Sequence, residues 1–224
     1  MVQGAFYKTL RVFYRAFHGR WHTQVKAPQV PTVYICSHQN MQGPITTLAY
    51  LPFPVHAWIL NVFFDRESCR KQYSEFTFSK RFGMPQWLAD ALAWIVSGVV
   101  SALVRSTGAI PVWRGTSRIN ETFRDSVEAL KAGESLLIFP DVEYSQDSGE
   151  MGKIYEGFIL LGRMYAHNTG LPLNFVPLYC DENRKEIVEG EPIRYDPTAP
   201  SKTERARIST ALVESVNRMA AQKA

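Results

Sequence analysis

Short apolar runs alternate with longer amphipathic segments along most of the chain. Apolar runs bounded by polar or turn-forming residues predict buried strands, and we expect strands at residues 33–36, 55–60, 109–113, 136–139 and 174–179. The segments between them carry helical spacing or helix end signals, and they predict helices at residues 43–51, 117–131, 156–167 and 204–221. Strands that alternate with helices favour an α/β fold, in which a mainly parallel sheet is flanked by helices.

The most apolar stretch of the chain covers residues 87–104. Asp90 is its only charged residue, and Arg105 follows directly after it. The length approaches what a helix needs to cross a bilayer, but Asp90, Gly98 and two serines weaken that interpretation. We therefore expect a helix that is either buried in the fold or pressed into a membrane surface. Residues 65–81, which precede it, are polar and predict helix and loop at the surface.

The first 26 residues combine aromatic and basic side chains, and no Asp or Glu occurs before Asp65. An apolar, largely aromatic stripe recurs at helical spacing, whereas the basic residues fall largely off it; the stripe comprises Phe6, Leu10, Phe13, Tyr14, Phe17 and Trp21. The pattern predicts an amphipathic helix over residues 1–26 that lies in the interface of an anionic membrane. The alternative is a helix that packs onto the protein by its aromatic face. Residues 27–224 are expected to form one α/β domain.

Composition narrows the compartment and the class of partner. The three cysteines, Cys36, Cys69 and Cys180, are widely spaced, which argues against a zinc site and a disulfide framework and favours a reducing compartment. The formal net charge of +4 also admits a nucleic-acid-binding protein, but no recognition motif supports one. We expect a peripheral or monotopic protein on the cytoplasmic side of a membrane, and no nucleic-acid partner.

Reactive side chains follow three of the predicted strands. Ligands of parallel α/β sheets bind at the carboxyl ends of the strands, and these positions hold Ser37, His38, Arg114, Asp141, Glu143 and Tyr144. A histidine there is suited to general base catalysis, because its pKa lies near neutrality. Asp141 and Glu143 have a second interpretation, since acidic residues often cap the turn that follows a strand.

Four segments resemble, in sequence and order, the motifs of the glycerolipid acyltransferase family, whose archetype is 1-acylglycerol-3-phosphate acyltransferase. The family carries NHxxxxD, GxIPVxR, FPEGTR and VPI or VPV blocks. The corresponding segments of this chain are SHQNMQG at 37–43, GAIPVWR at 108–114, FPDVEYS at 139–145 and VPL at 176–178. GAIPVWR is a full match, and FPDVEYS is a partial one because Asp141 replaces the glutamate.

The resemblance implies a glycerol-3-phosphate acyltransferase-like fold and a reaction in phospholipid synthesis. A fatty acyl group would pass from acyl-CoA or acyl-carrier protein to a lysophospholipid or glycerol-phosphate acceptor, without a cofactor or metal. Carried over by position, His38 is the general base, Arg114 binds the phosphate of the acceptor, and Asp141 binds an acceptor hydroxyl. Further candidates for substrate binding are Ser37, Gly108 and Tyr144.

The first block departs from the family pattern at Gly43, where the family has an aspartate that orients the histidine. Three consequences are open. Glu143 or Asp141 supplies the carboxylate from a neighbouring strand end, or a backbone carbonyl accepts from the ring of His38. In the third case His38 is no longer catalytic, and the protein is a lapsed member that binds membrane or lipid.

Overall fold

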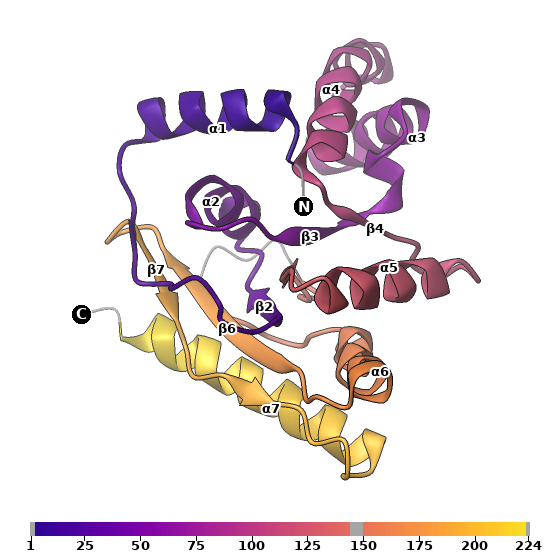
Figure 1. The fold of residues 1–224 in the computed structure, drawn as a ribbon. Coiled ribbons are helices and arrows are strands. Elements are labelled where there is room, and N and C mark those ends of the chain that lie inside the picture. Colours follow the sequence, from indigo (N-terminus) through magenta and orange to yellow (C-terminus); the bar gives the residue numbers. More distant parts are fainter. Residues whose placement is uncertain (1–2, 144–149, 223–224) are drawn as a thin grey trace. The chain divides into compact units, whose positions relative to one another are not determined.

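The computed structural model describes residues 3–143 and 150–222, and the chain divides into two compact units (Figure 1). The larger unit contains Arg11–His56 and Phe123–Ala224, and the smaller unit contains Met1–Leu10 and Ala57–Thr122. The fold class is α/β, with mostly parallel strands and flanking helices, as the alternating sequence pattern predicts.

The sheet of the larger unit has the strand order β1-β7-β6-β2-β5, and β8 pairs with β6. Strand β2 is parallel to both β5 and β6, while β7 and β8 are antiparallel to β6. The strands are β1 (His22–Thr23), β2 (Thr32–Cys36), β5 (Leu136–Ile138), β6 (Asn174–Asp181), β7 (Glu186–Glu189) and β8 (Ile193–Arg194). All five residues of β2 are buried, as expected for a central strand that is covered on both faces.

Helices cover both faces of this sheet. Helix α2 (Gln42–Tyr50) and helix α7 (Ser201–Ala221) lie on opposite sides of β6 (Figure 1). Alternate residues of the strands face α2, so Tyr34 and Cys36 share a core with Ala49 and Tyr50. Within the described part of this unit, the other helical elements are the second parts of α1 (Ala5–His18) and of α5 (Ile119–Lys131), the 3-10 turn η3 (Glu156–Ile159) and α6 (Leu160–Thr169).

Three strands of this unit were not expected. Strands β1, β7 and β8 are short and include polar or charged residues, so the apolar pattern gives no signal for them. The two antiparallel partners of β6 and the parallel pairing of β1 with β7 make the sheet mixed rather than fully parallel. The strand expected at residues 174–179 continues to Asp181 as β6.

The smaller unit contains a parallel strand pair and a helical hairpin. Strand β3 (His56–Leu60) pairs with β4 (Ile110–Val112), and the 3-10 turn η1 (Asn61–Phe63) follows β3. Helix α3 (Arg66–Lys71) continues into η2 (Gln72–Arg81), a π-helix, and both pack against α4 (Gln86–Thr107). Strand β3 and helices α1 and α5 each cross the boundary between the units.

The N-terminal segment forms helix α1 (Ala5–His18), and its arginines bond to helix α2. Arg11 Nε donates to the carbonyl oxygen of Ala49 at 2.8 Å, and Arg11 Nη2 donates to that of Leu51. Arg15 Nε donates to the same Ala49 oxygen at 2.6 Å. These carbonyls end α2 and carry the negative end of its dipole, so guanidinium groups stabilise them.

The apolar side chains along α1 remain exposed to a large extent. They recur at helical spacing and thus line one face: Phe6, Leu10, Phe13 and Phe17, the last with 83% of its surface accessible.

Candidate functional site

His38 lies in a tight loop between the end of β2 and the start of α2. Gln39 and Asn40 both have positive φ angles, 43° and 58°, a region that non-glycine residues seldom adopt. The loop closes through hydrogen bonds from the N–H groups of Met41 and Gln42 to the Gln39 oxygen, at 2.9 and 3.0 Å. Backbone strain of this kind is concentrated at functional sites in proteins.

Asp141 follows the neighbouring strand β5 and binds the backbone of this loop. Its Oδ2 accepts a hydrogen bond from the His38 N–H at 2.7 Å, and its Oδ1 accepts a longer one from Ser37 Oγ at 3.4 Å. Asp141 is itself held by a bridge to Ile154. The carboxylate therefore fixes the main chain that carries His38.

The electrostatic state of Asp141 is set by two opposing effects. Burial raises the pKa of the Asp141 carboxyl above its ordinary value of 3.8, because the charged form loses water. The hydrogen bonds that it accepts, led by the His38 N–H, act in the opposite direction. Burial is the larger effect, so the pKa is raised overall.

The imidazole of His38 is oriented by a main-chain carbonyl and an aromatic ring. Its Nδ1 lies 3.2 Å from the Asn40 oxygen, and its ring meets that of Phe139 edge-on, with centroids 5.8 Å apart. A carbonyl oxygen only accepts, so the bond requires a proton on Nδ1. In the neutral imidazole the lone pair then resides on Nε2, which is the form that a general base needs.

The space around Gly43 explains why no aspartate occupies this position. A Cβ atom placed there would lie 2.0 Å from the Ser37 carbonyl oxygen and 3.3 Å from that of His38. Gly43 N–H also donates to the His38 oxygen at 3.2 Å, which holds the two segments at this distance. The loop geometry thus requires glycine where the family pattern has its orienting carboxylate.

The structure brings Ser37, His38 and Asp141 together in the larger unit. Glu143 lies two residues beyond Asp141 and is exposed, and Tyr144 lies outside the described residues. The VPL segment is part of β6, where Pro177 pairs with Ile35 of β2. Three of the four segments that carry the resemblance therefore belong to this unit.

The GAIPVWR segment, residues 108–114, belongs to the smaller unit. Gly108 has a φ of 76° and ends α4 in the left-handed conformation, a position at which glycine is favoured for steric reasons. Arg114 follows β4 and is exposed. The preceding residue, Trp113, is covered by the guanidinium of Arg118, whose Cζ lies 3.4 Å from the ring centroid.

Sequence reasoning left open a main-chain acceptor for the ring of His38 without identifying Asn40, and it missed the neighbouring Gln39. The Asn40 carbonyl is a main-chain group, so no side-chain pattern announces it. Gln39 is buried, and within the described part of the chain its Nε2 is a buried side-chain atom for which no hydrogen-bond partner is found. Neither feature has a sequence signal, because both depend on the φ angles of the loop.

The chain matches no protein-family model, and no curated protein matches its sequence.

Proposed function

We propose that this protein is an acyltransferase with a glycerol-3-phosphate acyltransferase-like fold, which acts in phospholipid synthesis. It would move a fatty acyl group from acyl-CoA or acyl-carrier protein to a hydroxyl of a lysophospholipid or glycerol-phosphate acceptor. One observation carries the proposal: His38 Nδ1 lies 3.2 Å from the Asn40 carbonyl, at the carboxyl end of β2. This contact leaves Nε2 as the basic atom of the neutral ring.

The proposed reaction uses His38 as the general base in its first step and, once protonated, as the general acid in its second step. Nε2 takes the proton of the acceptor hydroxyl while the oxygen attacks the thioester carbonyl carbon. The tetrahedral intermediate collapses, the carbon–sulfur bond breaks, and the proton on His38 passes to the leaving thiolate. The products are the acylated acceptor and the free thiol of the carrier.

Asp141 acts in this scheme as a positioning residue rather than as the partner of the ring. Its bond to the His38 N–H fixes the loop from which the imidazole projects. A carbonyl partner at Nδ1 stabilises the developing imidazolium less than a carboxylate would, because it carries only a partial charge. We therefore expect slower turnover than an enzyme with the family aspartate. Arg114 is proposed to bind the acceptor phosphate through its planar guanidinium.

The exposed phenylalanines of α1 support the proposal that this helix lies in a membrane interface. Arg11 and Arg15 are engaged with α2, which leaves the apolar stripe of α1 as its outward feature. A helix whose basic side is held by the protein and whose apolar side is exposed is suited to the boundary between headgroups and acyl chains. The attraction to anionic lipid that the sequence predicts would then come from basic residues other than Arg11 and Arg15.

The test of acyl transfer compares His38→Ala with the wild type on detergent-dispersed lysophospholipids and several acyl thioesters. Loss of a general base lowers turnover by about 10²–10⁴-fold, and we expect a loss in this range. His167→Ala changes an exposed histidine of α6 and serves as the matched control. Equal product formation by His38→Ala and the wild type would refute the proposed role.

A second candidate function is that of a lapsed relative that binds lipid without turnover. The observation that favours it is that the Asp141 carboxylate accepts from the His38 main-chain N–H, so that Asp141 does not take the place of the aspartate that orients the ring in the family pattern. It predicts that lysophospholipid binds with the same affinity to the wild type and to His38→Ala, and that neither forms product.

A further inference from the structure

The helical hairpin of the smaller unit, residues 65–107, has its small side chains inside. The face of α4 that packs on α3 and η2 has a small residue at every fourth position: Ala89, Ala93, Ser97 and Ser101, all of them buried. Small residues let two helices approach closely, as they do in membrane helices. The Ser97 and Ser101 hydroxyls bond to carbonyls of their own helix, at 3.2 and 3.5 Å.

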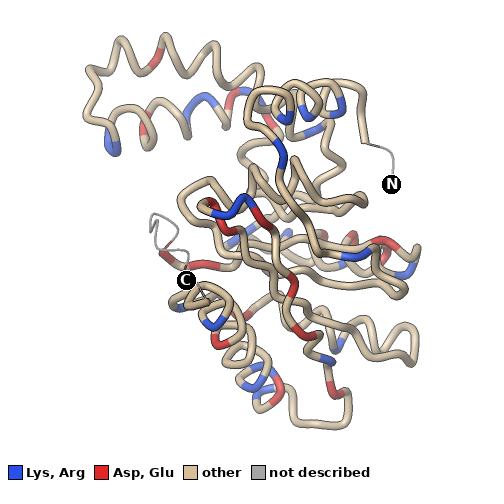
Figure 2. The backbone as a smooth tube through the Cα atoms, turned by 90° about the vertical axis from the view of Figure 1, so that its left-hand side faces the viewer, with Lys and Arg blue, Asp and Glu red and all other residues tan. Residues whose placement is uncertain are grey.

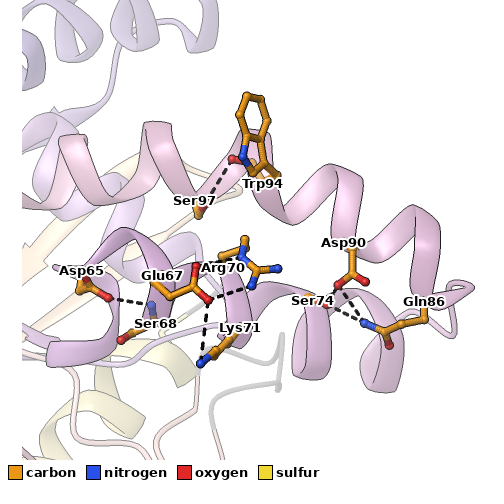
Figure 3. Close-up of polar contacts among 10 residues, drawn as sticks. All are labelled: Asp65, Glu67, Ser68, Arg70, Lys71, Ser74, Gln86, Asp90, Trp94 and Ser97. Carbon is orange, nitrogen blue, oxygen red and sulfur yellow. Dashed lines mark hydrogen bonds and ion pairs between the residues drawn. The ribbon is translucent and has the colours of Figure 1, made fainter.

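The single acidic residue of α4 is directed into the hairpin as well. Asp90 accepts hydrogen bonds from Ser74 of η2 and from Gln86 Nε2, the latter at 3.0 Å (Figure 3). Gln86 Nε2 also donates to Ser74 Oγ at 2.8 Å. Of the polar residues that weakened a membrane interpretation in the sequence, Asp90 thus bonds across the two arms of the hairpin, while the two serines bond within α4.

The opposite face of α4 carries large apolar side chains. Trp87 is 73% exposed, Trp94 61%, Ile95 60% and Val99 52%. The spacing of Trp87, Ile95 and Val99 places them on one side of the helix, and Trp94 lies at the edge of that side, where the Arg66 guanidinium of α3 is 5.0 Å from its ring centroid. Helix α4 is long and apolar enough to cross a membrane by length and composition, and less than a third of its most apolar stretch is buried. In α4 large apolar side chains are exposed and small ones are buried. In a helix that packs on the core of a water-soluble protein, the large apolar side chains are the buried ones.

Cations stand beside exposed aromatic rings where the two arms meet. Lys80 Nζ lies 4.3 Å from the ring centroid of Phe76, and Arg81 Cζ lies 6.0 Å from that of Phe82. Phe76 and Phe82 are themselves exposed. Figure 2 shows that α4 is almost free of charge along its length. Aromatic rings and basic groups side by side complement the headgroup region of an anionic bilayer.

We propose that this hairpin docks on a bilayer that contains anionic phospholipid. The face with Trp94, Ile95 and Val99 lies at the boundary of headgroups and acyl chains, and Lys80 and Arg81 contact lipid phosphates. The hairpin lies in the plane of the interface, because α3 carries Glu67 and Lys71 with side chains 59% and 62% exposed, and such charges are costly in hydrocarbon. Docking is independent of acyl transfer, since no residue of the hairpin is part of the proposed chemistry.

The experiment is flotation of the full-length chain with phosphatidylcholine vesicles that contain or lack phosphatidylglycerol. The variant Ile95→Glu/Val99→Glu places two charges on the outward face of α4. The control Val30→Glu/Leu171→Glu places the same charges on exposed apolar positions of the larger unit. We expect binding that needs phosphatidylglycerol, at least about a tenfold loss in the α4 variant, and no loss in the control.

Tryptophan quenching by brominated phospholipid in the same vesicles locates the contact. Trp94→Phe should remove much of the quenching, whereas Trp58→Phe, on β3, should not. The proposal is overturned if the α4 variant floats like the wild type, or if only Phe13→Glu/Phe17→Glu on α1 abolishes flotation. It is also overturned if α4 instead joins two copies, so that the wild type is dimeric and fails to float. The acyltransferase activity of the α4 variant is measured on detergent-dispersed acceptor, where no vesicle is needed. A variant that keeps this activity but no longer floats has lost membrane docking alone, whereas an inactive wild type would count against the proposed reaction and not against docking.

Discussion

Substitution of Gly43 tests whether the loop geometry or the family motif describes this site. Gly43→Asp places an aspartate at the position where the resembled motif has one, so the proposed enzyme would gain activity if it merely lacked an orienting carboxylate. The structure predicts damage instead. The first atom of any side chain would stand 2.0 Å from the Ser37 carbonyl oxygen and 3.2 Å from its carbon, and these are main-chain atoms that no rotamer change can move.

The size of the effect follows from the displacement that is needed. Carbon and oxygen atoms in contact lie more than about 3 Å apart, so the loop would have to move by about 1 Å. Overpacking at a buried site costs about 1–3 kcal/mol, and we expect the upper end because the Asp141 bond resists the movement. For a chain of this size, about 3 kcal/mol lowers the melting temperature by about 6–12 °C.

Thermal denaturation followed by circular dichroism measures this change. Gly43→Ala isolates the steric part and should lose about as much stability as Gly43→Asp. Gly152→Ala is the control, since a Cβ there meets nothing within 4 Å, and it should stay within about 0.5 kcal/mol of the wild type. A Gly43→Asp protein with an unchanged melting temperature and faster turnover would refute the reasoning, because the loop would then accept the carboxylate.

Three further predictions concern the residues that hold the site and α1 in place. Asp141→Ala leaves the His38 N–H without its acceptor and should lower the urea unfolding free energy by about 1–3 kcal/mol, whereas Asp141→Asn keeps an acceptor oxygen. Because the folded pKa of Asp141 is raised, the stability gained from its protonated form is complete below the unfolded pKa and is lost as pH rises through the folded pKa; the melting temperature of the wild type should therefore fall relative to that of Asp141→Asn as pH rises through this range. Arg11→Ala removes donors to the end of α2 and should cost about 1.5–3 kcal/mol of unfolding free energy, against little for the exposed Arg20→Ala; equal stability of the two would contradict the contact.

The strands of the central sheet could be predicted because burial on both faces leaves a continuous apolar run. Residues 33–36 and 136–139 coincide closely with β2 and β5. Strands β7 and β8 could not be found in this way, because their pairing with β6 is made by the backbone and their side chains include charges. Edge strands of this kind are determined by tertiary pairing rather than by local pattern.

The components of the site were easier to predict than their roles. The position of His38 after a strand and of Asp141 after the neighbouring strand followed from the parallel order. Which group of His38 each partner binds depends on the φ angles of Gln39 and Asn40, and the sequence does not specify those. Of the two carboxylates considered as partners of the ring, Asp141 binds the main chain of His38, and the ring has a main-chain carbonyl at Nδ1.

The two departures from the family motifs meet in one hydrogen-bonded arrangement. Gly43 lets the chain close over Ser37, and this closed loop presents its N–H to Asp141, which stands where the family has the longer glutamate. Asp141→Glu would insert a methylene into that contact and should cost about 1–3 kcal/mol, while the exposed Asp125→Glu costs little. In a double-mutant cycle with Gly43→Ala the two losses should be less than additive, because each one opens the same loop. Full additivity would show that the two departures are unrelated.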